Sequence, residues 1–391
     1  MLNTEETVRQ RYTRALTEKS PDLCCPTSYN PALLKGLPKE ILEIDFGCGD
    51  PSRFVREGDH VLDLGCGAGK ICYIAAQMVG PEGMVVGIDM NGDMLAIARK
   101  YQAEMSEKLG GVPIQFVKGY IQDLALDLEA TEEYLAKNPI ATHSDLLAFL
   151  AWQDWQRATQ PLVPGESVDL VLSNCVLNLV RDSEKEALIR EIVRVLKPGG
   201  RVALSDIVSD EDIPDALKRD PDLWSGCISG AFREDRFVQS LEKAGLAGIR
   251  IDSWEERPWK TVDGIDFRSV TLTAFKPFGT ECLDRGHAVI YRGPFKETRD
   301  EEEHIFPRGE RIAVCERTYR TLMDGPYAKD FIGIAPETLR TPREWCAPSG
   351  TRRPARETKN GRHEFPTAEE GCCPSPSDGE ISNDHGCCSC S

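Results

Sequence analysis

The chain has 391 residues, about the length of two or three average domains, and 40% of them are hydrophobic. Its 64 acidic and 47 basic residues give a net charge of -17, which argues against nucleic acid as a partner. No apolar run reaches the roughly 18 residues of a membrane-spanning helix, and residues 1–10 lack the pattern of a signal peptide. We therefore expect a cytoplasmic protein with no membrane partner.

Cysteine is the unusual residue in this composition, with 15 copies. An odd number cannot all pair within one chain, and a reducing compartment disfavours disulfides. We therefore expect thiols that act as ligands or redox groups, or that pack as small hydrophobic side chains.

In chain order, residues 1–57 are predicted to form an N-terminal helical and loop segment, with a helix over 5–18. This segment carries Cys24, Cys25 and Cys48. Cys48 lies in a Gly-Cys-Gly turn that we expect to be exposed and mobile.

Residues 58–276 are predicted to form one α/β domain. Its expected strands span residues 60–64, 84–89, 114–118, 168–173 and 201–206. The helices between them are expected over residues 70–79, 91–109 and 183–196, and an insertion at 124–164 has the apolar spacing of two more helices. Strands that alternate with helices predict a doubly wound, Rossmann-like parallel sheet.

The C-terminal third differs in character. Residues 277–346 are predicted to form a small α+β domain, with strands over 287–291 and 311–314. Residues 347–391 are rich in Pro, Gly, Ser and charge, which predicts a disordered tail. The tail carries Cys372, Cys373, Cys387, Cys388 and Cys390. They lack the separated Cys-x-x-Cys pairs of zinc modules, so no structural metal is expected, and capture of thiophilic ions, disulfide exchange or neither stays open.

A glycine-rich turn follows the first strand of the α/β domain, with Gly65, Gly67 and Gly69 at alternate positions. Glycine there permits a tight turn and a close approach of the next helix to a ligand. Asp89 ends the second strand about 20 residues later, where an acid holds the hydroxyls of a ribose. The spacing differs from the dinucleotide form Gly-x-Gly-x-x-Gly, so it favours S-adenosylmethionine, with NAD as the alternative.

Other residues agree with an adenosine pocket at this edge of the sheet. Residues 119–123 follow the third strand, where an adenine would lie, and Asp63 is placed toward the methionine end of the cofactor. Residues 194–201 resemble the turn before the fifth strand in class I methyltransferases. The predicted cofactor-binding residues are Asp63, Gly65, Gly67, Gly69, Asp89, Met90, Ile121 and Asn174.

Four cysteines are placed to meet beside this pocket. Cys72 lies in the first turn of a helix, where the helix dipole favours a thiolate. Cys175 follows the fourth strand, and Cys227 lies in a glycine-containing loop after the fifth. Because ligands of open α/β sheets bind beyond the carboxyl ends of the strands, these thiols and Cys48 are expected to converge. Cys66, between two glycines, is expected only to pack.

The histidines point to an acceptor that has no proton to lose. None of the six is predicted at this sheet edge, and methylation of oxygen or nitrogen usually needs such a base. Trivalent arsenic bound by thiolates carries a lone pair and needs no base. Thiolates are soft ligands that suit such a thiophilic element.

Four segments now carry a resemblance to a known family. They are residues 46–49 (Phe-Gly-Cys-Gly), 70–73 (Lys-Ile-Cys-Tyr), 173–179 (Ser-Asn-Cys-Val-Leu-Asn-Leu) and 226–227 (Gly-Cys). With the glycine turn, they make the chain similar to arsenite S-adenosylmethionine methyltransferases over about residues 48–206 and the loop at Cys227. The resemblance implies a class I methyltransferase that transfers methyl groups to thiolate-bound As(III), giving methyl- and dimethylarsenicals in arsenic detoxification.

The resemblance also implies roles for the thiols. Cys72, Cys175 and Cys227 would be the As(III) ligands, and Cys48 would form a disulfide with Cys72 during turnover. Arsenite and methylarsenite would be substrates, with thioredoxin or glutathione as reductant.

Two alternatives stay open from the residues themselves. One is a methyltransferase for another thiophilic element or a small organic acceptor. The other is a non-catalytic metalloid-binding protein on a methyltransferase scaffold. The insertion at 124–164 is longer than the family pattern, and the roles of Cys282, Cys315 and Cys346 are open.

Overall fold

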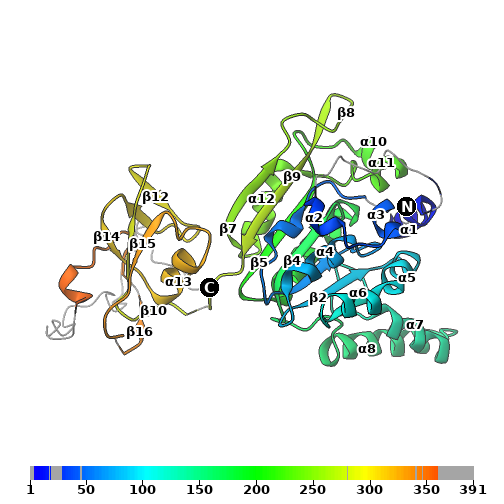
Figure 1. Cartoon of the computed structure of the whole chain (residues 1–391), viewed down its shortest axis with the longest axis horizontal. Helices are drawn as coiled ribbons and strands as arrows, with labels where there is room; N and C mark the ends of the chain where they lie inside the picture. The colour runs from blue at the N-terminus through cyan, green and yellow to red at the C-terminus, as the bar shows by residue number, and fades with distance from the viewer. Residues whose placement is uncertain are drawn as a thin grey trace. The chain divides into compact units, whose positions relative to one another are not determined.

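A computed structural model describes residues 4–16, 18, 29–44, 46–279, 281–339, 341–345 and 347–359 (Figure 1). The chain forms two compact units that meet in sequence between Lys276 and Pro277. Several predictions fall outside the described residues: those for Cys24, Cys25 and Cys346, and for the five cysteines of the tail.

Unit 1 is built on a nine-stranded sheet in which the order β3-β2-β1-β4-β5-β9-β7 forms the main path. Five strands run parallel: β1 (His60–Leu64), β2 (Met84–Asp89), β3 (Ile114–Lys118), β4 (Val168–Asn174) and β5 (Leu196–Ser209). They confirm the five predicted strands, and β5 is longer at both ends.

The far side of the sheet was not predicted from the sequence. β9 (Ile265–Phe275) pairs antiparallel with both β5 and β7 (Ala247–Trp254). Two short strands extend it, β6 (Phe232–Arg233) beside β5 and β8 (Lys260–Val262) beside β9. The sheet is therefore mixed, with a parallel half that carries the predicted cofactor motifs.

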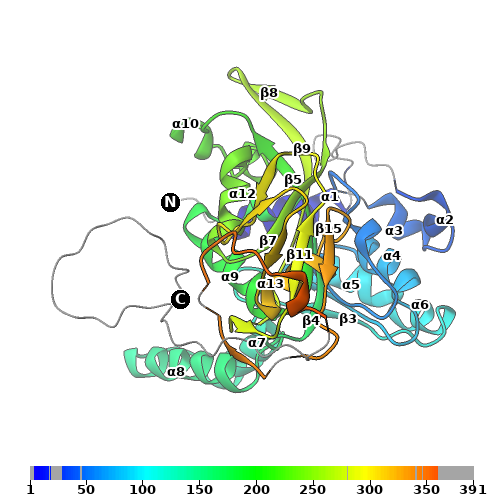
Figure 2. The same cartoon turned by 90° about the vertical axis from the view of Figure 1, so that its left-hand side faces the viewer.

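Helices cover both faces of this sheet, as Figures 1 and 2 show. One core contains Val61 and the apolar faces of α3 (Lys39–Glu43), α4 (Lys70–Val79), α5 (Gly92–Lys100) and α6 (Gln102–Lys108). The other contains Leu62, Leu64 and the apolar faces of α9 (Lys185–Val195) and α12 (Glu234–Lys243). Adjacent residues of β1 thus enter opposite cores, as the alternation of side chains along a strand requires.

The N-terminal helix α1 (Thr4–Ala15) lies against a distant segment, α11 (Pro221–Ser225). Arg11 on α1 donates hydrogen bonds to the Asp222 carbonyl oxygen and to Ser225 Oγ. The helix is therefore anchored next to the loop that carries Cys227. The remaining short helices of unit 1 are α2 (Pro31–Leu34), η2 (Pro51–Phe54), η3 (Leu177–Leu179), η4 (Asp182–Glu184) and α10 (Asp215–Lys218).

The insertion forms the two predicted helices, α7 (Leu128–Lys137) and α8 (His143–Thr159). Tyr134 of α7 stacks on Trp152 of α8 with ring centroids 4.5 Å apart. Thr142 begins α8 through a capping box with Asp145. In the described part of the chain, no helix combines the length and apolar character needed to cross a bilayer.

Unit 2 is a small α+β domain. Helix α13 (Glu316–Asp324) packs on β15 of a three-stranded sheet ordered β14-β11-β15, over a core that includes Val289, Phe306 and Phe331. Its strands are β10 (Leu283–Asp284), β11 (Ala288–Tyr291), β12 (Glu297–Arg299), β13 (Ile305–Pro307), β14 (Arg311–Ala313), β15 (Phe331–Ile334) and β16 (Arg343–Glu344), followed by η5 (Ala355–Glu357). The predicted strands at 287–291 and 311–314 correspond to β11 and β14.

The start of the predicted disordered tail differs from the structure. Residues 347–359 belong to unit 2 because Arg353, 4% exposed, donates a hydrogen bond to fully buried Asp284 at 2.8 Å. A polar composition cannot reveal this ion pair, since the two residues lie 69 positions apart.

Candidate active site

A cavity of unit 1 lies at the carboxyl ends of the parallel strands. The strand order reverses between β1 and β4, which is the switch point where open α/β sheets bind ligands. Four segments that follow β1, β2, β3 and β4 line the cavity, namely residues 65–68, 89–91, 119–122 and 174–176. They contain most of the predicted cofactor-binding residues.

The glycine turn after β1 has the geometry that its sequence requires. Gly65 and Gly69 have φ of +65° and +85°, in the region that L side chains rarely adopt. A Cβ atom at Gly65 would lie 2.4 Å from Val176, and one at Gly69 would lie 2.8 Å from Phe116. Both positions therefore exclude a side chain, and Gly69 lets α4 begin next to the cavity.

Two acids stand at the ends of β1 and β2. Asp89 accepts hydrogen bonds from the backbone N–H groups of Gly67 and Asn91, each at 2.8 Å, and burial nevertheless raises the pKa of its carboxyl. Asp63 is 2% exposed, and burial raises its pKa to about 7. Both acids line the cavity.

The lining residues suit an adenosyl sulfonium ligand. Met90 and Ile121 provide apolar surface for a base, and Asp89 stands where an acid meets ribose hydroxyls. Tyr12 and Phe46, with ring centroids 5.4 Å apart at right angles, add aromatic surface that attracts a positively charged sulfur. The residues present therefore fit S-adenosylmethionine.

Three of the four predicted thiols converge beside this cavity. The Cys175 thiol lies within 4.8 Å of the Cys48 thiol, and it is close enough to the Cys227 thiol for each to shift the pKa of the other. Cys227 Sγ also lies 3.3 Å from the Cys175 carbonyl oxygen, and Tyr12 Oη lies 4.0 Å from Cys227 Sγ. We call Cys48, Cys175 and Cys227 the thiol group.

The backbone of the thiol group is strained at two of its members. Cys175 and Cys227 have φ of +62° and +61°, although neither is glycine. Such conformations cost about 1–3 kcal/mol and persist where the surroundings fix them. Here the Cys175 N–H donates to the Ser205 carbonyl at 2.8 Å and the Cys227 N–H to the Trp224 carbonyl at 3.1 Å.

Cys48 departs from the expectation of an exposed, mobile turn, because it is only 5% exposed. Asn174 Oδ1 accepts hydrogen bonds from the N–H groups of Cys48 and Gly49, and Ser269 Oγ donates to the Cys48 carbonyl. These contacts hold the turn against β4 and β9. Asn174, predicted as a cofactor residue, lines the cavity and also fixes this turn.

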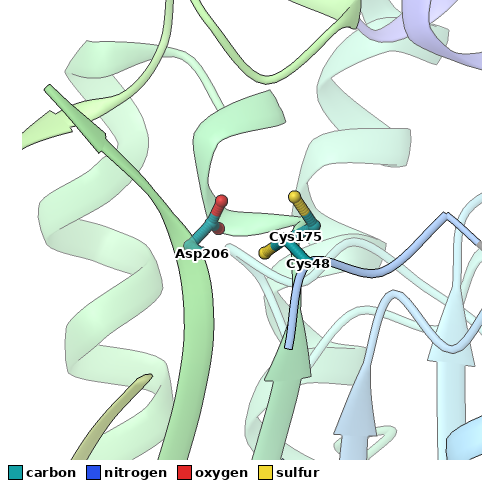
Figure 3. A group of neighbouring side chains, drawn as sticks. All are labelled: Cys48, Cys175 and Asp206. Carbon is teal, nitrogen blue, oxygen red and sulfur yellow. The ribbon is translucent and has the colours of Figure 1, made fainter. Parts of the chain in front are cut away.

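Asp206 is a site residue that the sequence reasoning missed. One carboxylate oxygen of Asp206, Cys48 Sγ and Cys175 Sγ all lie within 4.8 Å of one another. Figure 3 shows the three side chains as neighbours. The carboxyl is fully buried, and burial raises its pKa to about 6. A charged residue within the apolar run of β5 was the signal that could have identified it.

The net effect of burial and of neighbouring thiols is to raise the pKa values of the Cys175 and Cys227 thiols. Contact with Cys227 lowers the pKa of Cys175, but contact with Cys48 and burial together raise it well above its ordinary value. Contact with Cys175, and then burial, raise the pKa of Cys227 in the same way. These thiols are therefore protonated at neutral pH, and a thiophilic ligand has to displace their protons.

Cys72 occupies a different group from the one expected. Its thiol donates a hydrogen bond to Asp63 Oδ2 at 3.2 Å, and it packs with Cys66 over Gly87. Burial raises the pKa of Cys72 well above its ordinary value, which corrects the expectation that the helix dipole favours a thiolate there. Cys66 is buried in the core, and burial raises its pKa to about 11, in keeping with a packing role.

This fold and this cavity define an S-adenosylmethionine-dependent methyltransferase. A family profile described as a methyltransferase domain matches residues 56–245. A second profile, described as a domain of unknown function, matches residues 279–363 in unit 2.

Comparison with similar proteins shows which family of methyltransferases the chain resembles. An arsenite methyltransferase from Aquipseudomonas alcaligenes is 33% identical over 348 residues, which cover 83% of this chain and 89% of the relative. One from Mus musculus is 30% identical over 344 residues, which cover 85% of this chain and 80% of the relative. The crystal structure of an arsenic(III) S-adenosylmethionine methyltransferase from Chlamydomonas reinhardtii is 27% identical, with a TM-score of 0.53, covering 82% of this chain and 100% of that chain. The chain belongs to the arsenite methyltransferase family.

Proposed function

We propose that this protein methylates trivalent arsenic, giving methyl- and dimethylarsenicals, and so contributes to arsenic detoxification. The observation that carries the proposal is the position of Cys175. It is a member of the thiol group, and it also lines the cavity that fits the methyl donor. An arsenic atom on its sulfur is therefore next to the cofactor cavity. Arsenite and methylarsenite are the proposed substrates.

The chain's own residues supply binding and orientation. S-adenosylmethionine supplies a methyl group on a positively charged sulfur, which an incoming lone pair takes as the carbon–sulfur bond breaks. Asp89 holds the ribose and Asp63 lies toward the methionine end. Gly65 keeps space for the ligand, and Gly69 lets α4 begin next to the cavity. The acceleration then comes mainly from holding two reactants in one geometry.

Arsenite binding by thiols leaves arsenic able to react. Each thiol forms an arsenic–sulfur bond, and its proton leaves with an arsenic hydroxyl as water. Three such exchanges remove the hydroxyls and leave a lone pair on arsenic, which needs no base. Cys175 and Cys227 supply two of the sulfurs, and the family resemblance implies Cys72 as the third.

Formation of the arsenic–carbon bond raises arsenic from the trivalent to the pentavalent state. Two thiolates return the two electrons and become a disulfide, for which the resemblance implies Cys48 and Cys72. Thioredoxin or glutathione then reduces this disulfide. Because Cys72 is bonded to Asp63 here, its participation requires that this hydrogen bond breaks first.

The test is arsenic speciation after incubation of the full chain with arsenite, S-adenosylmethionine and a thiol reductant. Cys175→Ser and Cys227→Ser are expected to lose methylated products. Cys48→Ser is expected to lose turnover with arsenite but still to bind As(III). Cys315→Ser is the matched control, because Cys315 accepts a hydrogen bond from the Thr318 N–H in unit 2 and serine preserves it. Normal product formation by Cys175→Ser would refute the assignment.

A further inference from the structure

One buried carboxylate beside the thiols has no part in the proposed arsenic chemistry. We propose that Cys48, Cys175 and Asp206 form a binding site for a divalent, thiophilic d¹⁰ cation of the Zn²⁺ type. Their ligand atoms already lie within 4.8 Å of one another, and all three residues are buried (Figure 3). The three come from separate segments, the Cys48 turn, the end of β4 and β5.

The spacing of these atoms is close to what zinc requires. With Zn–S bonds of about 2.3 Å and Zn–O bonds of about 2.0 Å, tetrahedral ligand atoms lie roughly 3.5–3.8 Å apart. A contraction of at most about 1.3 Å brings the present atoms to that spacing. Two thiols and a carboxylate also supply the sulfur and oxygen donors that Zn²⁺ accepts.

The carboxylate is oriented by hydrogen bonds, as metal-binding carboxylates are. Asp206 Oδ2 accepts from the Leu177 and Asn178 N–H groups at 2.9 and 3.4 Å. Asp206 Oδ1 accepts from Asn178 Nδ2 at 2.7 Å and from the Ile207 N–H at 2.8 Å. One Asp206 oxygen lies within 4.8 Å of the Cys48 and Cys175 sulfurs, and Zn²⁺ has to displace one of these hydrogen bonds to reach it.

The number of ligands separates this site from the arsenic site. As(III) needs three thiolates and keeps a lone pair, whereas Zn²⁺ takes four ligands in a tetrahedron. Asp206 supplies the donor that arsenic does not use, and Cys227 or water completes the four. On binding Zn²⁺, the two thiols release two protons, and the dication offsets two of the three negative charges carried by the two thiolates and Asp206.

The two ligands share Cys175, so their binding is mutually exclusive. Zn²⁺ then inhibits methyl transfer by competing with arsenite, and this consequence rests on the proposed function. The metal site itself does not depend on it. A protein that binds Zn²⁺ as described but makes no methylarsenical would refute the proposed function and leave the site intact.

The experiment is a titration of the reduced, full-length chain with Zn²⁺ against a chromophoric chelator, with and without As(III). Each variant is compared with wild type for the loss of one Zn²⁺ site. We expect Asp206→Asn to weaken that site at least tenfold while As(III) affinity does not fall, because the loss of the negative charge beside Cys175 and Cys227 favours their thiolates. Cys175→Ser should abolish Zn²⁺ binding at this site and also As(III) binding. Cys72→Ser should weaken As(III) binding alone.

Cys315→Ser is the control for an unrelated buried thiol and should change neither the Zn²⁺ affinity nor the As(III) affinity. Circular dichroism and S-adenosylmethionine binding report whether each variant folds, and Cys48→Ser replaces Asp206→Asn if that variant does not. Addition of As(III) to the zinc-loaded wild type should release one equivalent of Zn²⁺. Equal Zn²⁺ affinity of Asp206→Asn and wild type would overturn the site. Binding of As(III) without release of Zn²⁺ would overturn the exclusion.

Discussion

Individual residues decide whether the thiol group forms, and this is where the sequence and the structure differ most. The sequence placed Cys175 and Cys227 correctly at one sheet edge because strand ends of a parallel sheet share an edge. It misplaced Cys72 in the group, missed Asp206 and expected an exposed Cys48. These three depend on side-chain direction and on distant hydrogen-bond partners, such as Asn174, which no local pattern encodes.

Positive φ at Cys175 predicts that a glycine substitution there is more stable than an alanine substitution, the reverse of the usual order. Cys175→Gly should be more stable than Cys175→Ala by about 1 kcal/mol, because glycine adopts this conformation without strain. At Cys72, inside α4, the order should be normal, with alanine the more stable by about 1 kcal/mol. Urea unfolding of the four variants measures both differences. If glycine were the less stable substitution at both positions, Cys175 would not be strained.

Raised thiol pKa values predict that arsenite binding accelerates with pH. Below the pKa, the thiolate fraction of Cys175 or Cys227 increases about tenfold per pH unit. The binding rate should therefore rise steadily between pH 6.5 and 8.5. Stopped-flow fluorescence is suited to this, because Trp224 lies three residues from Cys227. A rate that is level across this range would show that the thiols are already ionised at neutral pH.

The elements around the cofactor cavity were predicted well. β1 to β4 and α4 agree with their predicted bounds within about a residue because short apolar runs and glycine turns mark them directly. The single helix expected over 91–109 is two helices, α5 and α6, broken at Tyr101. β7 and β9 were missed because an antiparallel pair has no helix between its strands to mark it.

The turn between β1 and α4 predicts the effect of one added methyl group. Gly65→Ala should reduce S-adenosylmethionine affinity by tenfold or more, because its Cβ would overlap Val176 and displace the cavity wall. Gly110→Ala is the matched control, since Gly110 also has positive φ but nothing within 4 Å of its Cβ position. Isothermal titration measures both affinities. Equal affinities would contradict the steric argument.

The whole molecule consists of two units. Composition placed the end of the second unit, and the start of the disordered tail, too early, at residue 346. Arg353 lies beyond that boundary and pairs with Asp284 in the interior of unit 2. Breaking a buried ion pair by removing one partner costs about 3–5 kcal/mol, since the other charge stays buried. Asp284 keeps Arg343, which is 63% exposed, as a second partner at 3.0 Å, so we expect a cost near the lower end of this range. This cost should appear in the unfolding of unit 2.

Truncation tests that boundary. A chain ending at residue 346 should lose stability in unit 2 relative to a chain ending at residue 359. Arg353→Ala in the full chain should reproduce this effect, near the lower end of about 3–5 kcal/mol. Hydrogen exchange of β11 reports on unit 2, and β1 serves as the internal reference in unit 1. Unchanged protection of β11 after truncation at 346 would show that residues 347–359 do not stabilise the unit.

The central claim is that arsenic held by Cys175 and Cys227 receives the methyl group of S-adenosylmethionine. The direct measurement uses cofactor with an isotopically labelled methyl group, full-length protein, arsenite and a thiol reductant, followed by mass analysis of the arsenic species. The account predicts labelled methyl- and dimethylarsenicals from wild type and from Cys315→Ser, and none from Cys175→Ser. Recovery of arsenite without label from wild-type protein that binds both ligands would contradict it.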